Sequence, residues 1–196
     1  EQFANQWSQI KSTWTSARDK NQAFQQQALQ RRWNLSSGDD HKQWTQYGSG
    51  LAGRSSGGDF AINPTGDQII ENIHVAGLFT NSLSSQHNGV LHSPEFNVDF
   101  DDIWIQVAGL KSMGSRLRFV IENYPRVIGL LYLEQNPNSI DPTWIKFNMR
   151  YFHGDSMYLE LATAYDLPVE ARSQQRSWFG LTKVACLKAG QLPPVN

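Results

Sequence analysis

The stretch Val90–Tyr124, VLHSPEFNVDFDDIWIQVAGLKSMGSRLRFVIENY, decides the fold of this chain. Apolar residues alternate with others over Asp102–Ala108 and again over Arg116–Glu122, which is typical of strands whose two faces differ. Together with Leu91–Val98, these segments predict three consecutive strands. The apolar side of the third strand is predicted to face a core: Leu117, Phe119 and Ile121.

The same pattern continues through the rest of the chain from Phe60 onward. Further strands are predicted near 59–63, 68–75, 128–133, 144–152, 157–163 and 178–188. Turn residues separate them, as in NPTGD, SQHNG and FHGD. Many short strands divided by Gly, Pro and Asn turns favour an all-β sandwich or barrel.

Residues 1–33 have a different pattern. Apolar residues recur there at steps of four and three, with one polar position: Phe3, Trp7, Ile10, Trp14, Ala17, Asn21, Phe24 and Ala28. This spacing predicts a long amphipathic helix, with a break near 19–21 left open. Such a seam needs a partner, which can be the β domain, another copy or a recruited protein. We therefore expect a helical extension or linker over 1–33 and a β-sandwich over 34–196.

Composition excludes several classes of function. Seventeen Lys and Arg balance 18 Asp and Glu, so no basic footprint for nucleic acid exists, and no apolar run suits a membrane helix. Cys186 is the single cysteine, so an internal disulfide is excluded, and its apolar surroundings predict a buried thiol. The chain has no CxxCH sequence and is expected to hold no haem. Glu1 suggests a piece of a longer or processed protein.

The other sides of the strands carry polar and aromatic residues that suit a sugar. Trp104, Arg118 and Glu122 alternate with core positions, and Asn148 does so in TWIKFNMRYF. If one sheet gathers them, its outer face offers a stacking ring and hydrogen-bonding groups. The alternative is a solvated face with cross-strand ion pairs.

Loops at strand ends are the rival location for a ligand. The segment ENYPR provides Asn123, Tyr124 and Arg126, and SSQHNGVLH provides His87. The alternative for ENYPR is a turn that Asn123 closes and Pro125 fixes, with Tyr124 filling a corner of the core.

Acidic residues raise two further hypotheses. One structural Ca²⁺ needs six to eight oxygen ligands, for which Asp59 and Asp166 are the candidates. Glu122 and Glu160 could form the carboxylate pair of a glycoside hydrolase. We expect no enzyme, because the chain contains no recognisable catalytic motif.

Two resemblances to known proteins rest on longer stretches of sequence. HSPEF, IWIQVAGL, RLRFVIENY and SWFGLTKV are similar to galactose-binding-like jelly rolls, including modules of fructan-cleaving enzymes. WNLSSGDDHKQW, ENYPRVIGLLY and YFHGDSMYLELATAYDLP resemble the central region of large planctomycete proteins that carry a cytochrome-c-like domain. These resemblances imply a jelly-roll sandwich, a periplasmic or secreted setting and carbohydrate binding.

The prediction is a non-catalytic carbohydrate-binding module that targets a larger exported protein to polysaccharide. Its expected partners are a polysaccharide or oligosaccharide and neighbouring domains of the same polypeptide, with no nucleic acid or membrane. A structural or assembly module acting through the helix is the first alternative, and a glycoside hydrolase or lyase is the second.

Overall fold

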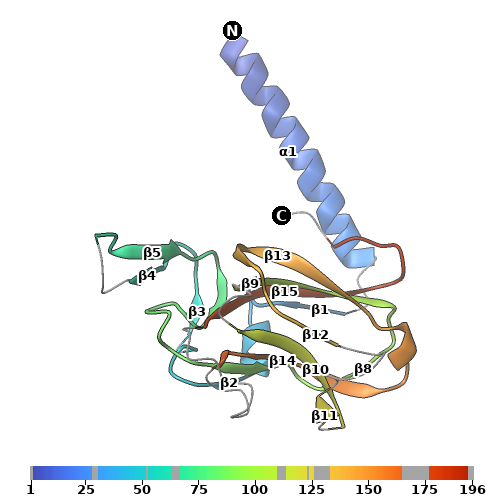
Figure 1. Cartoon of the computed structure of the whole chain (residues 1–196). Coiled ribbons are helices and arrows are strands. Elements are labelled where there is room, and N and C mark those ends of the chain that lie inside the picture. Colours follow the sequence, from blue (N-terminus) through green and yellow to red (C-terminus); the bar gives the residue numbers. More distant parts are fainter. Residues whose placement is uncertain are drawn as a thin grey trace.

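The structure is a computed structural model that describes residues 2–27, 31–51, 53–62, 67–109, 114–122, 124–125, 133–164 and 177–193. Two antiparallel sheets lie face to face, and one N-terminal helix stands away from them (Figure 1). The predicted all-β sandwich with a helical extension is confirmed. None of the described helices is long and apolar enough to span a membrane.

We call the first sheet the β9 sheet, after one of its central strands. Its path runs from β13 (Ser139–Asn148) through β9 (Asp102–Gly109), β15 (Phe179–Leu187) and β6 (Gly77–Phe79) to β3 (Arg54–Ser55). In addition, β1 (Arg31–Asn34) pairs with β15. Every described strand pair in this sheet is antiparallel.

We call the second sheet the β10 sheet. Its path runs from β11 (Tyr124–Pro125) through β10 (Arg116–Ile121), β14 (Ser156–Ala162) and β7 (Val90–His92) to β2 (Thr45–Tyr47). β12 (Glu134–Gln135) also pairs with β10, and β8 (Phe96–Asn97) with β14. A separate hairpin consists of β4 (Phe60–Ile62) and β5 (Ile70–Ile73).

The core lies between the two sheets. The predicted core residues Leu117, Phe119 and Ile121 are at most 5% exposed, and Cys186 is fully buried. Phe119 of the β10 sheet meets Phe147 of the β9 sheet edge to face, with ring centroids 5.1 Å apart. Period-two alternation therefore identified the inner faces correctly, because burial on one face imposes it.

The three predicted consecutive strands are not neighbours in space. β9 belongs to one sheet, whereas β7, β8 and β10 belong to the other. The expected strand 91–98 is two short strands, since Pro94 between them has no N–H for a ladder. The expected strand 144–152 begins earlier, at Ser139, and gives way to a 3₁₀ turn at Arg150–Phe152. The expected strand 128–133 lies almost entirely outside the described residues.

The helix α1 (Gln2–Gln27) is continuous, without a break near residues 19–21. Residues 31–34, which the sequence assigned mostly to the helix, form the edge strand β1. Trp33 of β1 is buried in the core and contacts Trp44 edge to face. The connection from helix to sandwich is therefore short, and the sandwich begins as early as residue 31.

Candidate functional site

The predicted polar and aromatic side chains occupy two different faces. Trp104 and Asn148 point outward from the β9 sheet, whereas Arg118 points outward from the β10 sheet. Glu122 follows the end of β10 in a turn, with φ of 49°, and is exposed. The expectation that one sheet gathers these residues is wrong. Period-two alternation orients a side chain outward but does not say which sheet its strand joins.

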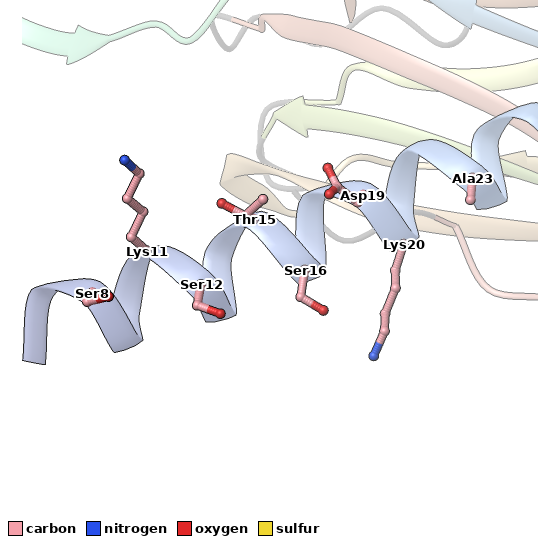
Figure 2. Close-up of a pocket in the computed structure, with 8 residues that line it drawn as sticks. All are labelled: Ser8, Lys11, Ser12, Thr15, Ser16, Asp19, Lys20 and Ala23. Atoms are coloured by element: carbon pink, nitrogen blue, oxygen red, sulfur yellow. The ribbon is translucent and has the colours of Figure 1, made fainter. Parts of the chain in front are cut away.

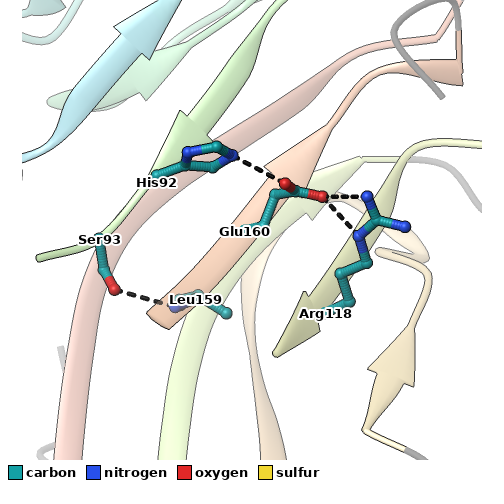
Figure 3. Close-up of polar contacts among 5 residues, drawn as sticks. All are labelled: His92, Ser93, Arg118, Leu159 and Glu160. Carbon is teal, nitrogen blue, oxygen red and sulfur yellow. Dashed lines mark hydrogen bonds and ion pairs between the residues drawn. The ribbon is translucent and has the colours of Figure 1, made fainter. Parts of the chain in front are cut away.

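The outer face of the β10 sheet carries a row of polar residues that crosses five strands. The register places them opposite one another: Thr45, His92, Glu160, Arg118 and Glu134. Figure 3 shows the centre of this row, which we call the Glu160 cluster and define as His92, Arg118 and Glu160. His92 Nε2 lies 2.7 Å from Glu160 Oε2, and Arg118 donates from Nε and Nη2 to Glu160 Oε1.

The electrostatics of the Glu160 cluster hold the carboxylate ionised. Burial raises the pKa of Glu160, but the hydrogen bond from His92 and the charge and hydrogen bond of Arg118 outweigh it. The net pKa of Glu160 therefore lies below the ordinary 4.5. Beside the cluster, burial and the charge of Glu160 raise the pKa of Tyr158. Both carboxylate oxygens already have partners, so the Glu160 cluster is internally satisfied.

The outer face of the β9 sheet has a different character. Trp144 lies opposite Gln106, which lies opposite Lys183. In the adjoining row, Lys146 lies opposite Trp104. Trp104 and Trp144 are thus diagonal neighbours on adjacent strands, and both rings are partly exposed. We call Trp104, Trp144, Gln106 and Lys183 the β9 platform.

Lys146 orients one ring of the β9 platform. Its Nζ lies 5.5 Å from the centroid of the Trp104 ring and 2.8 Å from Asp102 Oδ2. Asp102 is 1% exposed, so Lys146 neutralises a buried carboxylate while it lies over the indole. The indole Nε1 of Trp104 is buried, and within the described part of the chain it has no hydrogen-bond acceptor.

A hollow of about 450 Å³ adjoins the β9 platform. The residues that line it are Ser36, Val75, Ala76, Gln106, Pro142, Thr182 and Lys183. Thr182 Oγ1 lies 2.7 Å from Gln106 Oε1 and donates to it, which fixes the orientation of the amide. Burial lowers the pKa of Lys183, whose ammonium is partly removed from water. The platform thus combines two partly exposed rings with a neighbouring hollow whose walls are mostly apolar and carry a few polar groups.

Only two of the predicted loop residues, Tyr124 and His87, lie in the described parts of the structure. Tyr124 is 77% exposed in β11, so it does not fill a corner of the core. His87 is half-buried in a turn, and its backbone N–H donates to Ser84. Asn123 and Arg126 lie outside the described residues. His87 precedes β7, and two strands, β10 and β14, separate β7 from β11 with Tyr124, so these loops do not form one site.

The described residues offer no support for calcium. No three His, Cys, Asp or Glu side chains gather there in a way that could hold a metal ion. Asp59 is exposed at the rim of a second hollow, beside Phe60 and Leu83. The other candidate, Asp166, lies outside the described residues.

Two outward-facing residues were missed by sequence reasoning. Lys183 was absorbed into the apolar strand 178–188, where it is half-buried among buried neighbours. His92 falls within the predicted strand Leu91–Val98, but its contact with Glu160 from the end of β7 was not predicted. The charge of Lys183 in an otherwise apolar strand could have identified it, but only strand pairing could have joined His92 to Glu160.

Comparison with known proteins gives distant likenesses only. No protein-family model matches the chain, and no curated protein matches its sequence. The K3 cleaved adhesin domain of Lys-gingipain from Porphyromonas gingivalis is 11% identical, with a TM-score of 0.41, over 82% of this chain and all of that one. A CBM36-1 domain of a xylanase from the hindgut metagenome of Trinervitermes trinervoides is 10% identical, with a TM-score of 0.36, over 76% of this chain and 99% of that one.

A third solved structure is a carbohydrate-binding module, CBM36, in complex with calcium and xylotriose. It is 12% identical, with a TM-score of 0.32, over 71% of this chain and 97% of that one. At these values the neighbours are too distant to assign a family, a metal or a ligand to this chain. The resemblance to planctomycete proteins and the periplasmic setting stay predictions.

Proposed function

We propose that this chain is a non-catalytic carbohydrate-binding module and that the β9 platform is its binding face. The observation that carries the proposal is the pair of partly exposed rings, Trp104 and Trp144, beside a mostly apolar hollow with a few polar groups on its walls. The C–H groups on a pyranose face suit the negative face of an indole ring. Adjacent amide, hydroxyl and ammonium groups suit its hydroxyls, and a few fixed polar groups beside apolar walls are typical of ligand sites.

The Glu160 cluster supports the assignment by contrast. A ligand hydroxyl would have to displace His92 or Arg118 from Glu160, and each of those contacts is a charge-assisted hydrogen bond or an ion pair. On the β9 platform, both rings are partly exposed before any ligand arrives, although Lys146 lies over the ring of Trp104. We therefore place the sugar on the β9 sheet rather than on the β10 sheet.

The same cluster argues against a hydrolase built on Glu122 and Glu160. A general acid of a glycoside hydrolase needs a raised pKa, whereas that of Glu160 is lowered. Glu122 follows the strand in an exposed turn instead of sharing the outer row with Glu160. In the proposed role, the module holds a larger exported protein on polysaccharide and leaves the chemistry to other domains.

Titration calorimetry against a panel of neutral and acidic oligosaccharides tests the proposal. We expect the chain to bind at least one of them and the double variant Trp104→Ala, Trp144→Ala to lose that binding. Circular dichroism and the unfolding midpoint of the variant show whether the sandwich remains folded. Failure of the wild-type chain to bind any glycan in the panel would overturn the proposal.

A further inference from the structure

The helix α1 presents an apolar stripe that the sandwich does not cover. We define the helix seam as Phe3, Trp7, Ile10, Trp14, Ala17 and Asn21, spaced by four and three residues. Phe3, Trp7, Ile10 and Trp14 are 59–78% exposed. Figure 1 shows why: the helix points away from both sheets. With these four side chains in water, the helix lacks the packing of an apolar face from which most helical stability in proteins comes.

The opposite side of the helix is polar. Figure 2 shows the residues there, which are Ser8, Lys11, Ser12, Thr15, Ser16, Asp19, Lys20 and Ala23. At 100° per residue, the centre of this group lies about half a turn from the helix seam. The helix is therefore amphipathic, and only the seam is built to be buried against a partner.

We propose that the helix seam pairs with the same seam of a second copy, as a parallel two-stranded coiled coil. In heptad terms, Trp7, Trp14 and Asn21 occupy a positions, and Phe3, Ile10 and Ala17 occupy d positions. A single Asn at an a position specifies register and a two-stranded state, because it hydrogen-bonds to its equivalent across the pair. In-register pairing places Asn21 opposite Asn21 of the second copy.

The flanking charges favour the parallel arrangement. Lys11, Arg18 and Lys20 are the cations at e and g positions. In a parallel pair, Lys11 and Arg18 face uncharged residues of the other copy, Gln6 and Thr13 respectively. An antiparallel pair would instead place e positions beside e positions. It would therefore gather Lys11 and Arg18 of both copies on one flank, where like charges repel.

The area of the helix seam is sufficient for a specific dimer. An aromatic side chain buries about 150–250 Å², so covering most of Phe3, Trp7, Ile10 and Trp14 on two helices removes on the order of 1,000 Å² from water. A specific interface needs about 1,000 Å². Parallel pairing also places both sandwiches at the same end of the coiled coil. If the β9 platform binds sugar, as proposed above, two platforms on one polysaccharide gain affinity by avidity.

Sedimentation equilibrium of the full chain tests the pairing. We expect a dimer at tens of micromolar, and a dissociation constant raised by at least about 100-fold in the variant Trp7→Gln, Trp14→Gln. The matched control, Ser12→Gln and Ser16→Gln on the opposite side, should dimerise like the wild-type chain. A wild-type chain that is monomeric at about 100 µM would overturn the proposal and assign the seam to another polypeptide. A seam variant as dimeric as the wild type would do the same.

The orientation has its own test. The variant Asn21→Cys should form a disulfide between copies under mild oxidation, because parallel in-register pairing brings the two positions together. The native Cys186 is fully buried and does not compete. A dimer that sediments as expected but forms no such disulfide would overturn the parallel register. Neither test depends on glycan binding, so failure of the dimer and failure of the sugar site are distinguishable.

Discussion

The outer faces of the two sheets use polar residues in opposite ways. On the β10 sheet, His92 and Arg118 both contact Glu160, so these polar groups bind one another within the protein. On the β9 sheet, Trp104 and Trp144 stay partly exposed to water, beside a mostly apolar hollow. The difference lies in the rings: the β9 sheet offers partly exposed ring surface to a ligand, whereas the β10 sheet offers ions that already pair with one another.

The comparison predicts that the Glu160 cluster stabilises the fold and does not bind ligand. Glu160→Ala should lower the free energy of unfolding by about 3 kcal/mol, since it leaves the largely buried Arg118 without its carboxylate. Urea unfolding measures this, while glycan affinity of the folded variant should remain unchanged. The double variant Glu160→Leu, Arg118→Met should recover much of the loss, because no unpaired charge remains. A loss below about 1 kcal/mol in Glu160→Ala would remove the cluster's structural role.

The second prediction concerns one ring of the β9 platform. Trp104→Ala should weaken glycan binding by about 10- to 30-fold, or about 1.4–2 kcal/mol, because a stacked aromatic ring is a typical binding hot spot. Calorimetry on the best glycan of the panel measures it. The matched control is Tyr158→Ala, a partly exposed aromatic of the β10 sheet, which should bind like the wild type. Equal losses in the two variants would end the distinction between the faces.

A third variant tests how much the ion pair between Lys146 and Asp102, beside the β9 platform, contributes to the free energy of unfolding. Lys146→Met should lower the free energy of unfolding by about 1 kcal/mol, because it leaves the buried Asp102 without its cation. The side chain of Lys146 is 42% exposed, so this loss should be smaller than that of Glu160→Ala. Adding Asp102→Asn should restore stability. If Lys146→Met costs as much as Glu160→Ala, the two faces do not differ in their electrostatics.

The smallest effect is a pH dependence confined to the β10 sheet. The folded pKa of Glu160 lies below its ordinary value, so its contribution to stability is complete above pH 4.5. It is lost as pH falls below 4.5 through the lowered folded pKa. The difference in unfolding free energy between the wild type and Glu160→Gln should therefore shrink in that range. A constant difference down to the most acidic measurable pH would contradict the assigned pKa direction.

How much of this structure the sequence predicts depends on how far apart in sequence the interacting residues lie. The burial of Leu117, Phe119 and Ile121 was predictable because alternation is local. The separation of Trp104 from Arg118 was not, since β13 pairs with β9 and β14 pairs with β10 through contacts far apart in sequence. The sequence proposed one polar face, and the structure has two.

The helix shows the same limit. Its seam was predictable from the spacing of Phe3, Trp7 and Ile10, whereas its direction relative to the sheets depends on where the sandwich begins. The loop residues Asn123 and Arg126 and the acid Asp166 remain predictions, as do the ligand roles of Tyr124 and His87. Trp104 and Asn148 share the outer face of the β9 sheet, and their sugar roles stay predictions, whereas Arg118 pairs with Glu160 in the Glu160 cluster.

Nuclear magnetic resonance of the tryptophan side chains tests the β9 platform most directly. The chain has seven Trp, and each indole N–H gives its own signal in a ¹H–¹⁵N spectrum. On titration with a bound glycan, we predict that the signals of Trp104 and Trp144 shift, while those of the buried Trp33, Trp44 and Trp178 do not. Binding that leaves the Trp104 and Trp144 signals in place, or that shifts only residues around His92 and Arg118, would contradict the proposed site.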